Sequence, residues 1–66
     1  MRVHLRPQHR IVDVDGRRRV SALLTELGIL PGTAMVIRGD ALLLEGEMVE
    51  ADDEIEIRAV ISGGAA

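Results

Sequence analysis

The side chains of this sequence that could do chemistry are few. There are two histidines, His4 and His9, no cysteine, and serines only at Ser21 and Ser62. Two histidines without a cysteine make a poor metal site, so both are expected to be ordinary surface residues and no metal is expected. Neither serine lies near a histidine that carries an orienting acid, as a nucleophilic hydroxyl requires. The sequence therefore predicts no catalytic residue of its own.

Carboxylates are plentiful, with 11 Asp and Glu residues, but they fall in predicted turns and on exposed strand faces. Nothing in the sequence builds the apolar pocket that would raise the pKa of one of them for acid–base work. The glycines are scattered and lack the spacing that cradles a phosphate. A chain of 66 residues also has no room for a cleft between two lobes. A stand-alone enzyme is not expected.

The remaining chemistry lies in the main chain. Gly63 and Gly64 follow directly after an apolar run that ends at Ile61. Because glycine has no side chain, a Gly-Gly segment can pass through a narrow tunnel and adopt conformations closed to other residues. A carboxylate on Gly64 could thus be presented inside another enzyme. The simpler interpretation is a frayed end with nothing to bury.

The composition narrows the class of protein. At 47% hydrophobic and 29% charged residues it is that of a folded domain, held by aliphatic side chains alone because Phe, Trp and Tyr are absent. All eight basic residues are arginine. The lack of cysteine excludes disulfides and favours a cytoplasmic location. No apolar run is long enough to span a membrane and the start of the chain has no signal-peptide pattern, so no membrane partner is expected.

Charge is unevenly placed along the chain. Residues 1–20 hold six arginines against two aspartates, whereas residues 40–56 hold eight acidic residues and no basic one. A net charge of −3 and the absence of aromatic rings for stacking argue against direct nucleic-acid binding. The acidic stretch could dock a basic partner or form a solvated face, and the sequence leaves both open.

The first half of the chain predicts a hairpin followed by a helix. Val3 and Leu5 alternate with charged residues, as do Val12 and Val14, which predicts two antiparallel strands joined by a turn at 7–9. Apolar residues at 20, 23, 24 and 27 form one helical stripe, and Gly28 suits a left-handed cap at its end. The helix start is poorly marked. The arginines at 17–19 are expected to form a solvated loop, with a contact to an acidic or phosphate-bearing partner as the alternative.

The second half predicts short strands. They are expected at 34–38, as a short buried piece at 42–44, at 48–49 and, most clearly, at 54–61. The last strand is expected to return to the sheet centre. The order is that of an α+β, β-grasp (ubiquitin-like) fold, with a mixed four- to five-stranded sheet and one helix packed across it. Residues 1–61 would form this domain, and 62–66 a flexible C-terminal tail.

The chain resembles the ThiS/MoaD family of ubiquitin-related sulfur carriers over essentially its whole length. The matching segments are 1–5 (Met-Arg-Val-His-Leu), the helix end at 23–29, 35–40 and 52–64. The most specific is 59–64, Ala-Val-Ile-Ser-Gly-Gly. Within the family, this ending and the Arg-Gly-Asp turn at 38–40 look most like the carriers for 2-thiolation of tRNA, with the thiamine thiazole carriers close behind.

The resemblance implies a mechanism in which this chain is the substrate. An E1-like adenylating enzyme would use MgATP to activate the carboxylate of Gly64, with Gly63 threading that enzyme's site. A persulfide donor would then convert the carboxylate to a thiocarboxylate, and a sulfurtransferase or thiolase would pass the sulfur to its acceptor. The family docks its activating enzyme through the apolar sheet surface near the last strand, which makes Val60, Leu43 and Arg58 the candidate docking residues. The alternative for Val60 and Leu43 is a place in the core. No cofactor is expected on this chain itself.

One feature departs from the family pattern. Family carriers end at Gly-Gly, whereas this chain continues with Ala65-Ala66. The expectation is that a protease removes both alanines; the alternative is that carrier activity is lost.

Two other functions stay open from the sequence. The first is a protein modifier attached through Gly64 to target lysines, which could not build lysine-linked chains on itself because it contains no lysine. The second is a non-covalent β-grasp interaction module, for which the Gly-Gly segment would be irrelevant.

Overall fold

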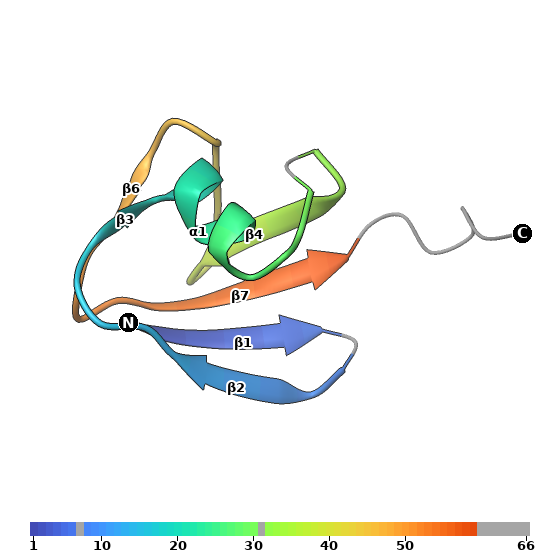
Figure 1. Ribbon diagram of the computed structural model, residues 1–66, viewed down its shortest axis with the longest axis horizontal. Helices are drawn as coiled ribbons and strands as arrows, with labels where there is room; N and C mark the ends of the chain where they lie inside the picture. The colour runs from blue at the N-terminus through green and yellow to red at the C-terminus, as the bar shows by residue number, and fades with distance from the viewer. Residues whose placement is uncertain (7, 31, 60–66) are drawn as a thin grey trace, which may run out of the picture.

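A five-stranded mixed sheet carries one short helix across one of its faces (Figure 1). The computed structural model describes residues 1–6, 8–30 and 32–59. In spatial order the sheet contains β2 (Arg10–Asp13), β1 (Arg2–Arg6), β7 (Glu54–Ala59), β4 (Ala34–Arg38) and β5 (Ala41–Leu43). The helix α1 spans Val20–Glu26, and a two-stranded ladder pairs β3 (Arg18–Arg19) with β6 (Met48–Val49). The predicted α+β, β-grasp architecture is confirmed.

The last strand occupies the centre of the sheet, as predicted. β7 pairs in parallel with β1, where Val3 is the register partner of Ile55, and antiparallel with β4, where Val36 is the partner of Ile57. Ile55 and Ile57 are buried under the helix, while Glu54, the first residue of the strand, faces the opposite side. The predicted continuation of this strand to residue 61 lies outside the described residues.

The hydrophobic core is entirely aliphatic. The helix contributes Val20, Leu23 and Leu24, and the strands contribute the facing side chains. The buried hydrophobic residues are Met1, Val3, Val20, Leu23, Leu24, Val36, Leu43, Val49, Ile55 and Ile57. Each fully buried Val, Leu or Ile stabilises the fold by roughly 1.5–3 kcal/mol. Aliphatic side chains therefore fill the core of this domain, where many small domains use aromatic rings.

The C-terminal end of α1 is defined by its own sequence. Gly28 has a φ of +76°, in the left-handed region. The amide of Gly28 donates to the carbonyl of Thr25 at 3.1 Å, and that of Ile29 donates to the carbonyl of Leu24 at 2.8 Å. This pair of bonds is the Schellman motif, which satisfies the last carbonyls of the helix. The predicted glycine cap is confirmed.

The N-terminal end of α1 is completed by a distant segment. Arg19 occupies the cap position and makes no side-chain capping bond. Instead, the amides of Val20 and Ser21 donate to the carbonyls of Glu47 and Glu45, at 2.8 and 3.0 Å. These carbonyls satisfy amides that a helix start otherwise leaves without partners. The turn before β6 therefore replaces the local capping residue that the sequence lacks.

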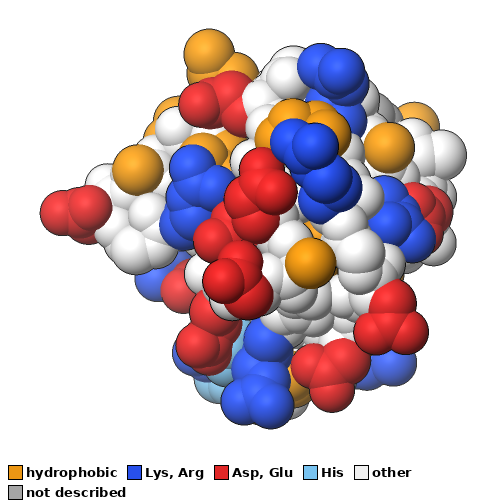
Figure 2. Space-filling model, turned by 90° about the vertical axis from the view of Figure 1, so that its left-hand side faces the viewer, with side chains coloured by type: hydrophobic (Ala, Val, Ile, Leu, Met, Phe, Trp, Pro, Cys, Tyr) orange, Lys and Arg blue, Asp and Glu red, His pale blue; other side chains and the backbone are white. Residues whose placement is uncertain are grey.

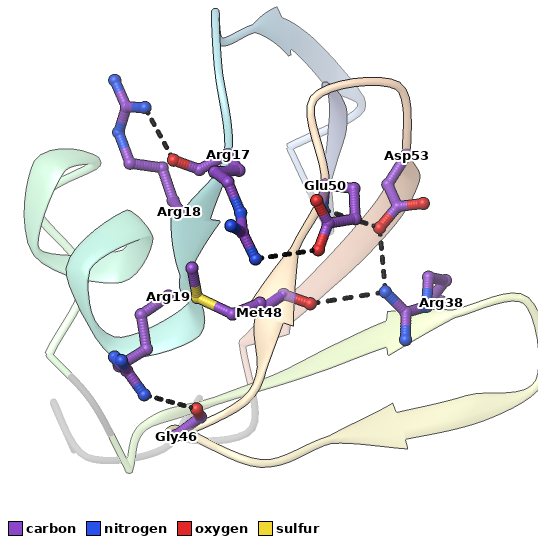
Figure 3. A network of polar contacts seen from close by, with 8 residues as sticks. All are labelled: Arg17, Arg18, Arg19, Arg38, Gly46, Met48, Glu50 and Asp53. Carbon is purple, nitrogen blue, oxygen red and sulfur yellow. Dashed lines mark hydrogen bonds and ion pairs between the residues drawn. The ribbon is translucent and has the colours of Figure 1, made fainter.

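The expected solvated loop at the arginine run is wrong for Arg18 and Arg19, which form β3 against β6. The side chains also bond within the molecule. Arg17 pairs with Glu50 at 3.3 Å, and Arg19 donates to the carbonyl of Gly46 at 2.9 Å (Figure 3). Glu50 and the carbonyl of Gly46, both from the second half of the chain, thus bind two of the three arginines, and Arg18 pairs with Glu26 at 2.6 Å. The partners from the second half lie about thirty positions away in the sequence, which is why these pairings were not predicted.

A polar network holds the turn that leads into β7 (Figure 3). One carboxylate oxygen of Asp53 accepts from the amide of Glu50 at 2.9 Å and from Arg38 Nη1 at 2.8 Å. Arg38 also donates to the carbonyl of Met48 at 3.4 Å. The amide bond from Glu50 and the guanidinium of Arg38 hold the pKa of Asp53 below its usual value of 3.8. The network links β4, β6 and the start of the central strand.

Replacing Gly28 with alanine should destabilise the fold. Nothing lies within 4 Å of the added Cβ, so the cost is that of a left-handed backbone, about 1–2 kcal/mol in the free energy of unfolding. Gly46→Ala is the matched control, because that site is equally open and has no positive φ; its change should stay within about 0.5 kcal/mol. Urea unfolding of both variants checks this. Equal losses would contradict the assignment of the cap.

The free energy of unfolding should fall as the pH drops through the pKa of folded Asp53. Its folded pKa is lowered, so its contribution is present above the unfolded value and is lost as protonation removes the bond to Arg38. Asp53→Asn should lose about 1 kcal/mol at neutral pH and show a flatter acid limb. Asp52→Asn, which leaves both bonds to Asp53 intact, is the control. Identical acid limbs for Asp53→Asn and the wild type would contradict the network's role.

Candidate functional site

The sheet has one end at which the last strand finishes. β7 and β1 are parallel and Arg6 is the register partner of Arg58, so the ends of these two strands lie side by side. The turn residue His9 and the first residue of β2, Arg10, lie at the same end because β2 runs back along β1. We call Arg6, His9, Arg10, Arg58 and Ala59 the exit end. The chain continues from here into residues 60–66, so the predicted residues Val60, Gly63 and Gly64 lie outside the described part.

The exit end is rich in arginine. Glu56 Oε2 accepts a hydrogen bond from Arg58 Nε and lies 4.0 Å from Arg6 Nε. The bond from Arg58, supported by the positive charges nearby, lowers the pKa of Glu56. Arg6 Nη1 donates to His9 Nδ1 at 2.9 Å, which makes this nitrogen the acceptor of the imidazole. His9 itself has a φ of +57° and turns the hairpin. One carboxylate thus serves two arginines.

The opposite end of the sheet is acidic. Asp13, Asp15, Asp52, Asp53 and Glu54 line an open cavity of about 490 Å³ there. The amine of residue 1 lies in the same cavity wall, and it donates to two backbone carbonyls at 2.5 and 2.7 Å. Figure 2 views the molecule from this side and shows Asp and Glu side chains near the centre of the face, with arginines beside them. This cavity thus has five carboxylates against Arg2 and the N-terminal amine, whereas the exit end has three arginines against Glu56.

The predicted docking residues fall in different places. Arg58 is exposed at the exit end, where a partner can reach it. Leu43 is only 7% exposed and belongs to the core, the alternative that the sequence left open, so its side chain offers no surface for docking. The expectation of a buried piece at 42–44 holds for Leu43 alone, because Leu42 is 56% and Leu44 67% exposed.

The open face of the sheet carries an apolar strip that was not predicted from the sequence. Leu42 is the register partner of Ile37, and Met35, two residues before Ile37 on β4, is also exposed. We call Met35, Ile37, Leu42 and Leu44 the apolar strip. Alternation with the buried Leu43 and Val36 could have revealed it, but three consecutive leucines conceal a period of two.

The described residues, 1–6, 8–30 and 32–59, contain no cluster of three or more metal-ligating side chains. Within the same residues, α1 is far too short and no helix is long and apolar enough to cross a membrane. The described part offers no arrangement of nucleophile, base and orienting acid. What it does provide is a central strand, paired on both sides, that ends in a positively charged region.

The chain is similar to a known carrier protein over nearly its whole length. No protein-family model matches the chain. The chain is 42% identical over 65 residues to the sulfur carrier protein TtuB of Thermus thermophilus. The match covers 97% of this chain and 100% of that protein.

Truncation of Leu43 should lower the free energy of unfolding much more than truncation of Leu42. Leu43→Ala removes a core side chain and should lower the free energy of unfolding by about 2–4 kcal/mol. Leu42→Ala removes an exposed neighbour of the same type and should change it by less than about 0.5 kcal/mol. Urea unfolding distinguishes them. A loss at Leu43 no larger than that at Leu42 would contradict its place in the core.

Proposed function

The chain belongs to the ThiS/MoaD-like ubiquitin-related sulfur carriers of the TtuB type, and from this premise we propose that its reacting group is the carboxylate of Gly64. The observation that carries the proposal is full-length similarity to a sulfur carrier, combined with Gly63-Gly64 directly after the central strand. In this proposal the chain is a substrate that other enzymes activate and discharge, and its own side chains take no part in bond making.

The first step of the proposed chemistry is activation of the carboxylate. An E1-like adenylating enzyme binds MgATP, and an oxygen of the Gly64 carboxylate attacks the α-phosphorus. Pyrophosphate leaves and an acyl-adenylate forms. A free carboxylate is a poor electrophile, whereas the adenylate carries AMP as a good leaving group. MgATP belongs to the partner enzyme in this scheme.

The second step replaces AMP with sulfur. The terminal sulfur of a persulfide on a donor protein attacks the acyl carbon and AMP departs, which leaves an acyl disulfide. A second thiol of the partner attacks the donor-side sulfur of that disulfide. The thiocarboxylate of Gly64 is released, and the two partner thiols are left oxidised as a disulfide. The electrons for this cleavage come from the thiols of the partner proteins, since this chain has no cysteine.

The fold would serve this chemistry by holding the departure point of the segment that carries Gly64. β7 is bonded to β1 on one side and β4 on the other, so Arg58 is held between Arg6 and Met35, and Ala59 pairs with Ala34. Beyond it, glycines at 63 and 64 present no side chain to a narrow channel. Arg58 at the exit end, Val60 next to it and the apolar strip are the surfaces proposed to dock the activating enzyme.

The proposed sulfur acceptor is a tRNA uridine, activated and held by a thiolase or sulfurtransferase, because the similarity is to a TtuB protein. Synthesis of the thiamine thiazole is the second candidate acceptor pathway. We further propose that a protease removes Ala65-Ala66 first. Adenylation at Ala66 would place the methyl side chains of both alanines in a channel that, in this proposal, accommodates only glycine.

Reconstitution with purified partners tests this function. The chain 1–64 should release pyrophosphate when mixed with an E1-like adenylating enzyme of its host and MgATP, and should gain sulfur at Gly64 when a persulfide donor is added. The chain 1–66 should do neither. Gly64→Ala in the 1–64 chain is the matched control, because it restores a terminal methyl group and should lower the rate strongly. Absence of pyrophosphate release from both lengths of the chain would overturn the proposal.

A further inference from the structure

We propose that Arg6, Arg10 and Arg58 form an arginine collar that pairs with carboxylates on the enzyme surface that receives the C-terminal segment. This inference rests on the proposed function and names the chemistry of its docking surface. The partner is a protein with acidic side chains around the entrance of its channel. The collar guides the exit end of the carrier toward that entrance.

The register of the sheet is the first observation. Arg6 and Arg58 are direct partners across the β1–β7 pair, so two guanidinium groups project from neighbouring positions on the same face. Like charges placed directly opposite one another destabilise a sheet. Glu56 lies beside both arginines but carries one charge, so part of this repulsion remains. A group of like charges that is only partly neutralised is typical of a functional surface.

Incomplete neutralisation is the second observation. Glu56 is the carboxylate that reaches both arginines, and it carries a single charge. In the described part of the chain, Arg10 forms no ion pair within 4 Å, and its register partner is Leu5, so its side chain leaves the exit end on the face opposite that of Arg6 and Arg58. Three arginines against one glutamate leave the exit end positive. The side chains of Arg6 and Arg58 are 44% and 58% exposed, which keeps them accessible.

The shape of the exit end fits carboxylate side chains. Arg6, His9, Arg58 and Ala59 line an open hollow of about 360 Å³ where β7 ends. A guanidinium presents two parallel N–H groups to a carboxylate, and such pairs are shorter and stronger than neutral hydrogen bonds. Arg6 and Arg58 could each turn from Glu56 toward an incoming acid at the rim of this hollow.

The distribution of charge over the whole molecule favours a protein partner over RNA. The opposite end of the sheet carries five acidic residues around one cavity, against Arg2 and the N-terminal amine, and the net charge of the chain is −3. A polyanion such as tRNA would be repelled by most of this surface. A localised acidic rim on a protein would attract the exit end and repel the other end, so that the carrier approaches with its C-terminal segment forward.

Association kinetics with the adenylating enzyme test the collar. The rate constant for association, measured by stopped flow at low salt, should fall about three- to tenfold for Arg58→Gln and for Arg10→Gln. Arg2→Gln is the matched control: it lies on the same face as Arg6 and Arg58 at the far end of β1, is 57% exposed, and should stay within twofold of the wild type. High salt should remove the difference.

Two further measurements distinguish long-range electrostatic steering from a direct contact that needs the guanidinium group. Arg58→Lys keeps the charge and should retain the wild-type association rate, because long-range attraction does not need the planar group. Adenylation of the Arg2→Gln control at saturating carrier should match that of the wild type. Circular dichroism and urea unfolding confirm that each variant is folded.

The outcomes distinguish this inference from the proposed function. If the wild type is adenylated while Arg58→Gln and Arg10→Gln associate at the wild-type rate, the collar alone is wrong. If Arg2→Gln slows association equally, net charge rather than the exit end acts, and the collar is again wrong. If the variants lose affinity for tRNA but not for the enzyme, the surface is an RNA contact. If the wild type neither associates with the enzyme nor is adenylated, both proposals fall.

Discussion

The pairing of β7 on both sides is the constraint on which the rest of the structure depends. Its inward face supplies Ile55 and Ile57 to the core beneath the helix, and its outward face carries Glu56 and Arg58. β1 holds it in parallel and β4 antiparallel, so neither end can move without breaking a ladder. A strand that is held this way makes a fixed base for whatever follows it in the chain. In a protein whose chemistry is proposed to lie beyond its last strand, that is the mechanical requirement.

The charged residues are distributed unevenly between the two ends of this central strand. Acidic residues from the second half of the chain pair with arginines from the first, as in the contact of Arg17 with Glu50, and Arg38 fixes Asp53 at the start of β7. These exposed pairs stabilise the fold modestly. Their larger effect is on the distribution of charge, because the far end keeps an acidic excess while the exit end stays positive. A 66-residue chain can thus present a positive end and an acidic end to a partner.

Much of the fold could be predicted because its signals are local. The alternation around Val3, the helical stripe and the cap at Gly28 each occur within a few residues. The start of the helix could not be predicted, because its amides bond to carbonyls of Glu45 and Glu47 more than twenty residues away. The pairing of Arg18 with Val49 was hidden for the same reason. Of the candidate site, Arg58 could be placed by alternation, whereas its adjacency to Arg6 required the parallel register that only the folded sheet provides.

The most direct test of the central claim, that Gly64 carries the sulfur, is the intact mass of the protein recovered from its native host. If Gly64 carries the sulfur, the recovered chain has lost Ala65-Ala66 and one oxygen of its terminal carboxylate is exchanged for sulfur. Higher-mass covalent adducts would assign Gly64 to protein conjugation instead. A chain recovered only in its unaltered form, ending at Ala66, would contradict the claim.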